Sequence, residues 1–207
     1  MNTNTLPTKN NLMHLQEKIK LSYEGQELLE KKKFILTIEK NKYIKKQREL
    51  ESQLSTLFKD AYLKFKNASV DVGIDKLINI SQEIPFETSI NIKYKTIMGV
   101  EIPSVIFEKK DLNLNYGLLK TTLSVDETII AFTKIKNLLI ELSEIENTIF
   151  RLNINILKVQ KRSNALKDII IPQDEKDLNN IKNTLEEHER EEFSRLKIVK
   201  KKAENGG

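Results

Sequence analysis

Few residues of this chain could act in catalysis or bind a metal, and their spacing does not match a known catalytic or metal-binding motif. The two histidines, His14 and His188, lie near opposite ends of the sequence and have no clear carboxylate partner for a metal site. Cysteine is absent, which excludes disulfides, thiolate catalysis and Cys-ligated zinc. The sequence also lacks the Gly-x-x-x-x-Gly-Lys-Ser/Thr loop that cradles nucleotide phosphates. We therefore expect no catalytic residue, no metal site and no cofactor.

A dense acidic run near the C-terminus is the one cluster of carboxylates. Its members are Glu186, Glu187, Glu189, Glu191 and Glu192. Carboxylates that exchange protons in catalysis need a walled pocket to shift their pKa values. Here Glu186 precedes Arg190 by four residues and Glu191 precedes Arg195 by four, which is the favourable order for ion pairs on a helix. The run therefore predicts a salt-bridged helix surface.

Positive charge is concentrated in the first part of the chain. Residues 1–50 hold eleven Lys and Arg against six Asp and Glu, which accounts for the whole net charge of +5. The basic residues that stand close together are Lys31, Lys32, Lys33, Lys40, Lys42, Lys45, Lys46 and Arg48. This stretch has two interpretations, a solvated helix face or a surface for nucleic acid or an acidic protein. Aromatic platforms for single-stranded nucleic acid are missing from it, because Phe34 and Tyr43 stand alone.

Long helices must position these residues, because the 207-residue chain contains only six glycines and four prolines. Apolar residues recur in strict seven-residue phase over forty residues of the C-terminal half, with one serine as the only polar member. They are Ala131, Ile135, Leu138, Leu142, Ile145, Ile149, Leu152, Ile156, Val159, Ser163, Leu166 and Ile170. A 3.5-residue repeat of this length indicates a left-handed supercoil around a partner helix.

The N-terminal part carries a second heptad seam, in which Gln and Lys dilute the apolar positions. It consists of Leu12, Leu15, Ile19, Ser22, Gln26, Leu29, Lys33, Leu36, Lys40, Tyr43, Gln47, Leu50, Leu54, Leu57 and Ala61. Two long helices near opposite ends of the sequence pair most simply as a hairpin. We therefore predict an all-α fold, a long antiparallel two-helix left-handed coiled coil with a small central β-hairpin.

The segments between and around the helices set the expected boundaries. Pro7 and Thr8 predict the N-terminal cap of the first helix. Alternation at Ile90, Ile92 and Tyr94, and the run 105–107, predict two short strands around a turn that contains Gly99 and Pro103. Ser124 to Glu127 fits a capping box, and Pro172 should kink or restart the last helix. The predicted divisions are residues 8–84, with a break near 69–73, then 85–120, then 124–203, kinked near Pro172.

The hydropathy of the chain predicts a soluble protein. No stretch approaches the roughly 18 continuous apolar residues of a membrane span, and the polar opening 1–5 does not fit a signal peptide.

Three segments resemble a known family in the same order along the chain. The segment 158–166 (KVQKRSNAL), then 169–172 (IIIP) and 185–197 (LEEHEREEFSRLK), resembles the D subunit of the V-type and archaeal-type rotary ATPases. The opening 7–9 (PTK), with 25–33 (GQELLEKKK), is similar to the N-terminal pattern of that family, and 98–103 (MGVEIP) is similar to its middle turn. The chain departs from the family where Phe34 and Ile35 follow the lysines. The motif residues expected to contact partners are Pro7, Thr8, Lys9, Gly25, Leu28, Leu29, Lys31, Arg162, Asn164, Ala165, Leu166, Pro172, Glu189, Arg190, Arg195, Leu196 and Lys197.

The resemblance implies a rotor shaft without catalytic residues of its own. It implies that both termini lie inside the ring of catalytic and nucleotide-binding A and B subunits, and that a small companion of the central stalk, the F subunit, sits on the coiled coil. It further implies a funnel-like protein between the other end and the membrane rotor, at the cytoplasmic face, with no membrane insertion and no nucleic acid. H⁺ and Na⁺ both stay open as the coupling ion. The alternative hypothesis is a non-motor coiled-coil scaffold or a nucleic-acid-associated helical arm.

Overall fold

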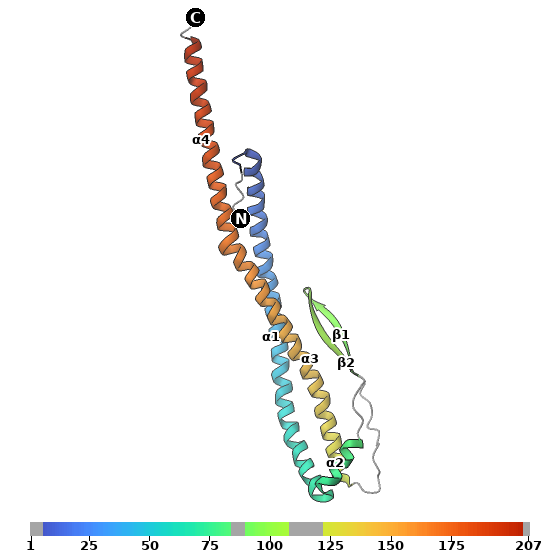
Figure 1. Ribbon diagram of the computed structural model, residues 1–207. Helices are drawn as coiled ribbons and strands as arrows, with labels where there is room; N and C mark the ends of the chain where they lie inside the picture. Colours follow the sequence, from blue (N-terminus) through green and yellow to red (C-terminus); the bar gives the residue numbers. More distant parts are fainter. Residues whose placement is uncertain (1–5, 84–89, 108–121, 205–207) are drawn as a thin grey trace. The chain divides into compact units, whose positions relative to one another are not determined.

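The computed structural model describes residues 6–83, 90–107 and 122–204. The chain divides into two compact units, Met1–Phe34 with Leu157–Gly207, and Ile35–Ile156. Helix α1 (Lys9–Val72) and helix α3 (Leu123–Ala165) each contribute to both units. The other elements are α2 (Ile74–Glu83), β1 (Ile90–Ile97), β2 (Val100–Phe107), the π-helical turn η2 (Leu166–Ile170) and α4 (Ile171–Glu204) (Figure 1).

Helix α1 begins where the sequence predicts. The Thr8 carbonyl accepts from the amide of Leu12 at 3.0 Å, and the Thr8 Oγ1 accepts from the amide of Asn11 at 3.3 Å. A side-chain oxygen that satisfies one of the four free amides is the usual N-cap contact. The predicted role of Pro7 and Thr8 as the helix entry is thus confirmed.

Helix α1 ends at Val72, and the φ of 85° at the following Gly73 is a left-handed conformation that glycine adopts without steric cost. The chain turns there into α2. The hydroxyl of Ser124 donates to the carboxylate of Asp71, and α3 already begins at Leu123. Ser124 is therefore inside the helix, and the prediction that it opens a capping box is wrong.

The two strands pair antiparallel in a hairpin with the register Ile97↔Val100 to Ile90↔Phe107. The two turn residues, Met98 and Gly99, both have positive φ, 50° and 76°, as a type I′ turn requires. The prediction of Gly99 in the turn is confirmed, whereas Pro103 lies within β2 opposite Tyr94. Counted from the turn, this is a position without ladder hydrogen bonds, so the missing N–H of proline costs the ladder nothing.

In the unit Ile35–Ile156, α1 and α3 run antiparallel. Lys40 contacts Asn153 at 3.4 Å near one end, and Asp71 contacts Ser124 at the other. Ala61, Ala131 and Ile135 form a buried cluster, against which further apolar side chains pack from both helices; these are Leu54, Leu57, Phe58 and Phe132. Leu36 and Leu152 are fully buried.

In the other unit, α1 is antiparallel to the end of α3 and to α4. Glu30 contacts Ser163, Lys18 contacts Asp174, and Lys9 contacts Glu189. Within this unit the buried residues continue from Val159 and Ser163 to Ile171, Asp174 and Ile181. Each unit, taken by itself, thus contains α1 antiparallel to helices from the C-terminal half of the chain.

The predicted seams can be compared with burial residue by residue. All residues of the predicted α1 seam, from Leu12 to Ala61, are buried or half-buried, and so are those of the α3 seam from Ala131 to Leu166. The prediction fails at Ile170, which is 37% exposed, while Ile171 is 3% exposed. The reason is η2, which adds one residue to the helix directly before Pro172. The predicted class is confirmed: the chain is all-α, with a long helical hairpin and a small β-hairpin.

Candidate interaction surfaces

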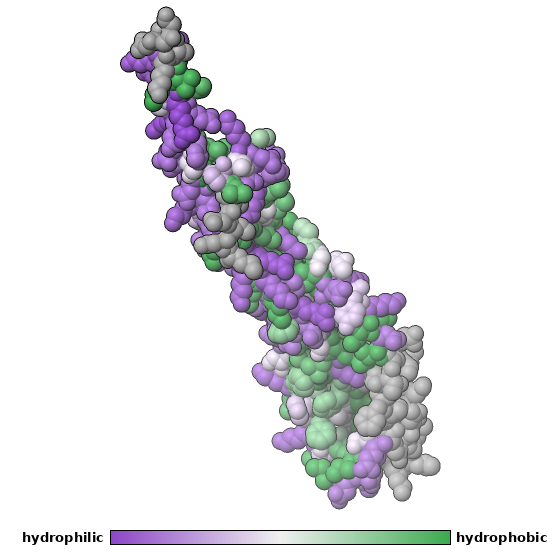
Figure 2. All heavy atoms as spheres, turned by 45° about the horizontal axis from the view of Figure 1, so that its top comes forward, coloured by the Kyte–Doolittle hydropathy of each residue, from purple (hydrophilic) through white to green (hydrophobic). Residues whose placement is uncertain are grey.

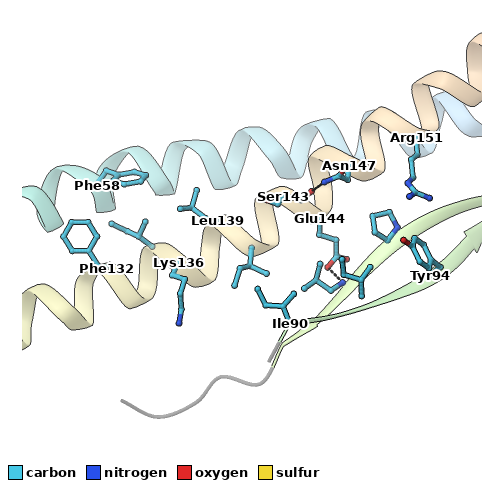
Figure 3. A pocket seen from close by; sticks show the side chains of 15 residues that line it. Phe58, Ile90, Tyr94, Phe132, Lys136, Leu139, Ser143, Glu144, Asn147 and Arg151 are labelled. Carbon is cyan, nitrogen blue, oxygen red and sulfur yellow. Dashed lines mark hydrogen bonds between the residues drawn. The ribbon is translucent and has the colours of Figure 1, made fainter. Parts of the chain in front are cut away.

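Two charged residues of α3 hold the β-hairpin against the helix (Figure 3). The amide of Val105 donates to the Oε2 of Glu144 at 2.8 Å. The guanidinium of Arg151 donates to the carbonyl of Glu101 at 3.3 Å and lies 5.2 Å from the centre of the Tyr94 ring. A two-stranded hairpin is marginally stable alone, and these contacts, together with the buried Val100 and Ile102 of the hairpin, stabilise it.

An open cavity of about 620 Å³ lies between the hairpin and the helices of this unit. Its lining is mostly apolar, with Phe58, Phe132 and Leu139 on the helices and Ile90 on the hairpin (Figure 3). Among the described residues that line it, Glu144 is the one carboxylate, and its Oε2 accepts from the amide of Val105.

Metal ligands do not gather at any point of the described chain. Among the residues 6–83, 90–107 and 122–204, no group of three or more His, Cys, Asp or Glu side chains could hold a metal ion. Within the same part of the chain, no helix is both long and apolar enough to cross a membrane.

Polar contacts cross between α1 and the C-terminal helices of the unit that contains the termini. Lys18 Nζ lies 2.7 Å from Asp174 Oδ1, and the Tyr23 hydroxyl donates to Glu175 Oε1 at 2.7 Å. The bond to Glu175 raises the pKa of Tyr23 above its ordinary value of 10.0. Asp174 is 7% exposed and its Oδ2 has no partner among the described residues. These contacts fix which residues of the two helices lie opposite each other.

A third polar contact lies within the apolar seam itself. The hydroxyl of Ser163, which is 1% exposed, donates to Glu30 Oε1 at 2.7 Å, and Lys33 Nζ lies 2.6 Å from Glu30 Oε2. The hydrogen bond from Lys33, and then that from Ser163, lower the pKa of Glu30 below its ordinary value of 4.5.

The Ser163→Ala variant should lose stability in a pH-dependent way. Because the folded-state pKa of Glu30 is lowered, its contribution is complete above about pH 4.5 and disappears as the pH falls through the folded-state pKa. At pH 7 we expect a melting temperature lower by roughly 1 to 3 °C, since water screens this partly exposed carboxylate. Thermal melts by circular dichroism from pH 7 to pH 3 should show the difference vanish. Ser143→Ala, at an exposed serine of α3, is the control, and a constant difference at all pH values would contradict the assignment.

The C-terminal end of α4 carries apolar side chains that nothing in the described chain covers. Ile181 is 5% exposed, and Lys9 and Glu189 form an ion pair of 2.9 Å further along α4. The apolar side chains of α4 after this ion pair are exposed. Phe193, Leu196, Ile198 and Val199 are 57–71% exposed. Figure 2 shows hydrophobic groups among hydrophilic ones on the last turns of the helix. The ion pairs Glu186–Arg190 and Glu191–Arg195, at 3.8 and 3.6 Å, are those expected from the sequence.

A second uncovered apolar region lies where α1 turns into α2 in the unit Ile35–Ile156. The side chains concerned are Tyr62, Leu63, Val70, Ile74, Ile78 and Leu123, which are 51–79% exposed. Exposed apolar side chains near one turn of the chain are a candidate surface for contact with another protein.

The basic stretch of α1 is partly neutralised along its own helix. Lys31 pairs with Glu27 and Lys42 with Glu39, both at 2.6 Å. Lys45, Lys46 and Arg48 are exposed on the helix surface. Exposed charges make weak and screened contacts, so this surface can meet an acidic partner without holding it tightly.

The residues predicted from the motifs lie in one unit but do not form one cluster. Among them, in the described part of the chain, Lys9 and Glu189 form the one ion pair that joins two helices. Gly25 leaves open space, since a Cβ there would meet nothing within 4 Å, and Leu28 beside it is 65% exposed. The other members lie along the helices with their side chains exposed or half-buried: Leu29, Lys31, Arg162, Asn164, Ala165, Leu166, Pro172, Leu196 and Lys197.

The cross-helix polar pairs were not predicted from the sequence. Lys18–Asp174, Tyr23–Glu175 and Glu30–Ser163 join residues more than a hundred positions apart, and heptad phase alone does not give the register between two helices. The serine in an otherwise apolar seam was the one available signal.

This geometry defines a class of protein, a helical hairpin in which polar pairs fix the register of the buried seam. Among the described residues, its exposed apolar side chains lie on the helix surfaces. Residues 11–201 match the family model of the ATP synthase D subunit. The D subunit of the V-type ATP synthase of Thermotoga neapolitana is 33% identical over 196 residues, which cover 95% of this chain and 97% of that protein. The D subunits of the A-type ATP synthases of Thermococcus sibiricus and Pyrococcus horikoshii are each 34% identical over 197 residues, covering 94% of this chain and 92% of theirs.

The chain belongs to the family of the ATP synthase D subunit, the central-stalk component of V-type and A-type ATPases. The resemblance inferred from its motifs is thus confirmed.

Proposed function

We propose that this chain is the non-catalytic shaft that transmits torque between the ATP-processing ring and the membrane rotor, at the cytoplasmic face of the membrane. The observation that carries the proposal is the uncovered apolar end of α4, with Phe193 71% and Leu196 67% exposed on a helix whose earlier turns are packed. Side chains of this kind need a partner. The ring formed by the A and B subunits is the partner that membership of this family suggests.

Stiffness is the physical requirement for a shaft. Each unit has two antiparallel helices with a buried seam, and polar pairs such as Lys18–Asp174 resist sliding of one helix along the other. Such a pair resists twisting better than a single helix. A rotating shaft must also release its contacts with the ring at each step, and the weak, screened contacts of a charged surface allow this.

The remaining surfaces suggest the other partners. The apolar region around Ile74 and Leu123 suits the funnel-like protein over the membrane rotor. The hairpin held by Glu144 and Arg151 suits the companion F subunit. The open space at Gly25, beside the exposed Leu28, would let a partner approach the backbone closely. The basic residues of α1 would face acidic loops of the ring.

Replacing Phe193 and Leu196 together by serine tests the proposal. Because both side chains are exposed, the isolated double variant should melt within about 2 °C of the parent. Assembly with purified A and B subunits, measured by size-exclusion chromatography and ATPase rate, should weaken at least about tenfold, which corresponds to about 1.4 kcal/mol.

Two exposed residues of the same helix provide the control. Asn179→Ser with Asn183→Ser changes exposed polar side chains of α4 and should leave assembly nearly unchanged. Unweakened assembly of the Phe193/Leu196 variant would mean that the end of α4 does not enter the ring.

A further inference from the structure

The π turn Leu166–Ile170 joins two stretches of buried seam that are out of phase with each other. Before the turn the covered positions are Val159, Ser163 and Leu166; after it they are Ile171, Asp174 and Ile181. The step from Leu166 to Ile171 is five residues, where a coiled coil alternates steps of three and four. The amide of Ile171 donates to the carbonyl of Leu166, an i to i−5 bond that takes in the extra residue.

A continuous α-helix would place the wrong side chains against α1. Steps of four and three from Leu166 lead to Ile170, Gln173 and Asp177, so two polar side chains would be buried without partners. Ile171 and Ile181, which are 3% and 5% exposed, would turn toward water. The phase of the residues after Pro172 therefore requires an insertion of one residue at this place.

Pro172 is accommodated by the same turn. Proline lacks an amide hydrogen, and its ring crowds the carbonyl four residues earlier in a regular helix. Here it stands at the second residue of α4, immediately after the π turn, and it is exposed. The shift in the spacing of the buried residues and the proline therefore both occur at this turn.

We infer that the π turn is a phase-correcting joint, imposed by the seam after it and not by Pro172, and that it opens more readily than the packed seam before it. Leu166 is half-buried and the other four residues of the turn are exposed, so packing contributes little to its local stability. Adding or removing one helical residue rotates everything beyond it by about 100°, so the joint fixes which face α4 presents to α1. This inference does not depend on the proposed function.

Deletion of one residue distinguishes two possible causes of the π turn, the spacing of the buried residues and the presence of Pro172. The starting point is the Pro172→Ala variant, in which a regular helix has no steric obstacle. Deleting the exposed Asp168 in that background should restore a continuous α-helix with both stretches of seam facing α1, and the melting temperature should stay the same or rise. Deleting Glu146, an exposed acidic residue in the middle of α3, is the matched control. It throws Ile149 and Leu152 out of phase with Leu142 and should lower the melting temperature by at least about 10 °C.

Hydrogen exchange of the amides at 166–171, followed by mass spectrometry, tests the opening. In the parent and in Pro172→Ala these amides should exchange at least about tenfold faster than those of 152–160, and the added deletion of Asp168 should remove the difference. If Pro172→Ala alone slows this exchange, the proline causes the turn and the inference is wrong. It is equally wrong if deletion of Asp168 lowers the melting temperature as much as deletion of Glu146, or if the parent amides exchange no faster than their neighbours.

Discussion

Replacing Leu152 by alanine should lower the melting temperature of the isolated chain by about 5 to 15 °C. Leu152 is fully buried on α3, and truncation of a buried leucine costs about 2–5 kcal/mol in lost burial and residual cavity. For a chain of this length 1 kcal/mol corresponds to about 2–4 °C. Thermal unfolding followed by circular dichroism in the far ultraviolet measures the change directly.

Leu157→Ala is the matched control on the same helix. Its side chain is 53% exposed, so the same chemical change should shift the melting temperature by less than about 2 °C. If the two variants melt alike, the apolar seam does not lie where the structure places it.

A single disulfide between this chain and the ring should stop sustained ATP turnover in the assembled complex. The chain has no cysteine, so a Lys182→Cys variant carries one defined thiol. Lys182 is exposed and follows Ile181, which is packed, so a bond there cannot be bypassed by swivelling of a loose helix end. With a second cysteine on the facing ring surface, ATPase rate should fall in proportion to the fraction of cross-linked complex.

Reduction of the disulfide is the control for that experiment. Recovery of the rate after reduction would separate blocked rotation from damage caused by the substitutions. Undiminished turnover at complete cross-linking would mean that this chain does not rotate against the ring at that position.

The helical part of the fold was predictable because heptad spacing reports burial directly. Every predicted seam residue from Leu12 to Ala61 and from Ala131 to Leu166 is covered, since an apolar side chain repeated every 3.5 residues has only one way to leave water. The π turn was missed although the sequence contains its signal. Leu166 and Leu178 are both half-buried and twelve residues apart, one more than the eleven that steps of four, three and four give, and the structure takes the extra residue into the turn Leu166–Ile170.

The errors elsewhere have local causes. Pro103 was assigned to the turn because proline is common in turns, but the alternation of hydrogen-bonded positions also admits it inside a strand. Ser124 fits a capping box by spacing, yet a carboxylate from a distant part of the chain, Asp71, takes its hydroxyl. The candidate surfaces were partly predictable: the motifs pointed to the end of α4, but only burial shows that Phe193 and Leu196 are uncovered while Ile181 is not.

The last turns of α4 have exposed apolar side chains and are not packed against α1. With Phe193 and Val199 in water, this segment gains nothing from the packing that stabilises most protein helices, and a helix of this length is marginal in isolation. The ion pairs Glu186–Arg190 and Glu191–Arg195 support it, each worth a few tenths of a kcal/mol and weakened by salt. The helicity of this end should therefore depend on its surroundings as well as on its sequence. In the free chain it should be frayed and sensitive to salt, and it should be complete when a partner covers the apolar face.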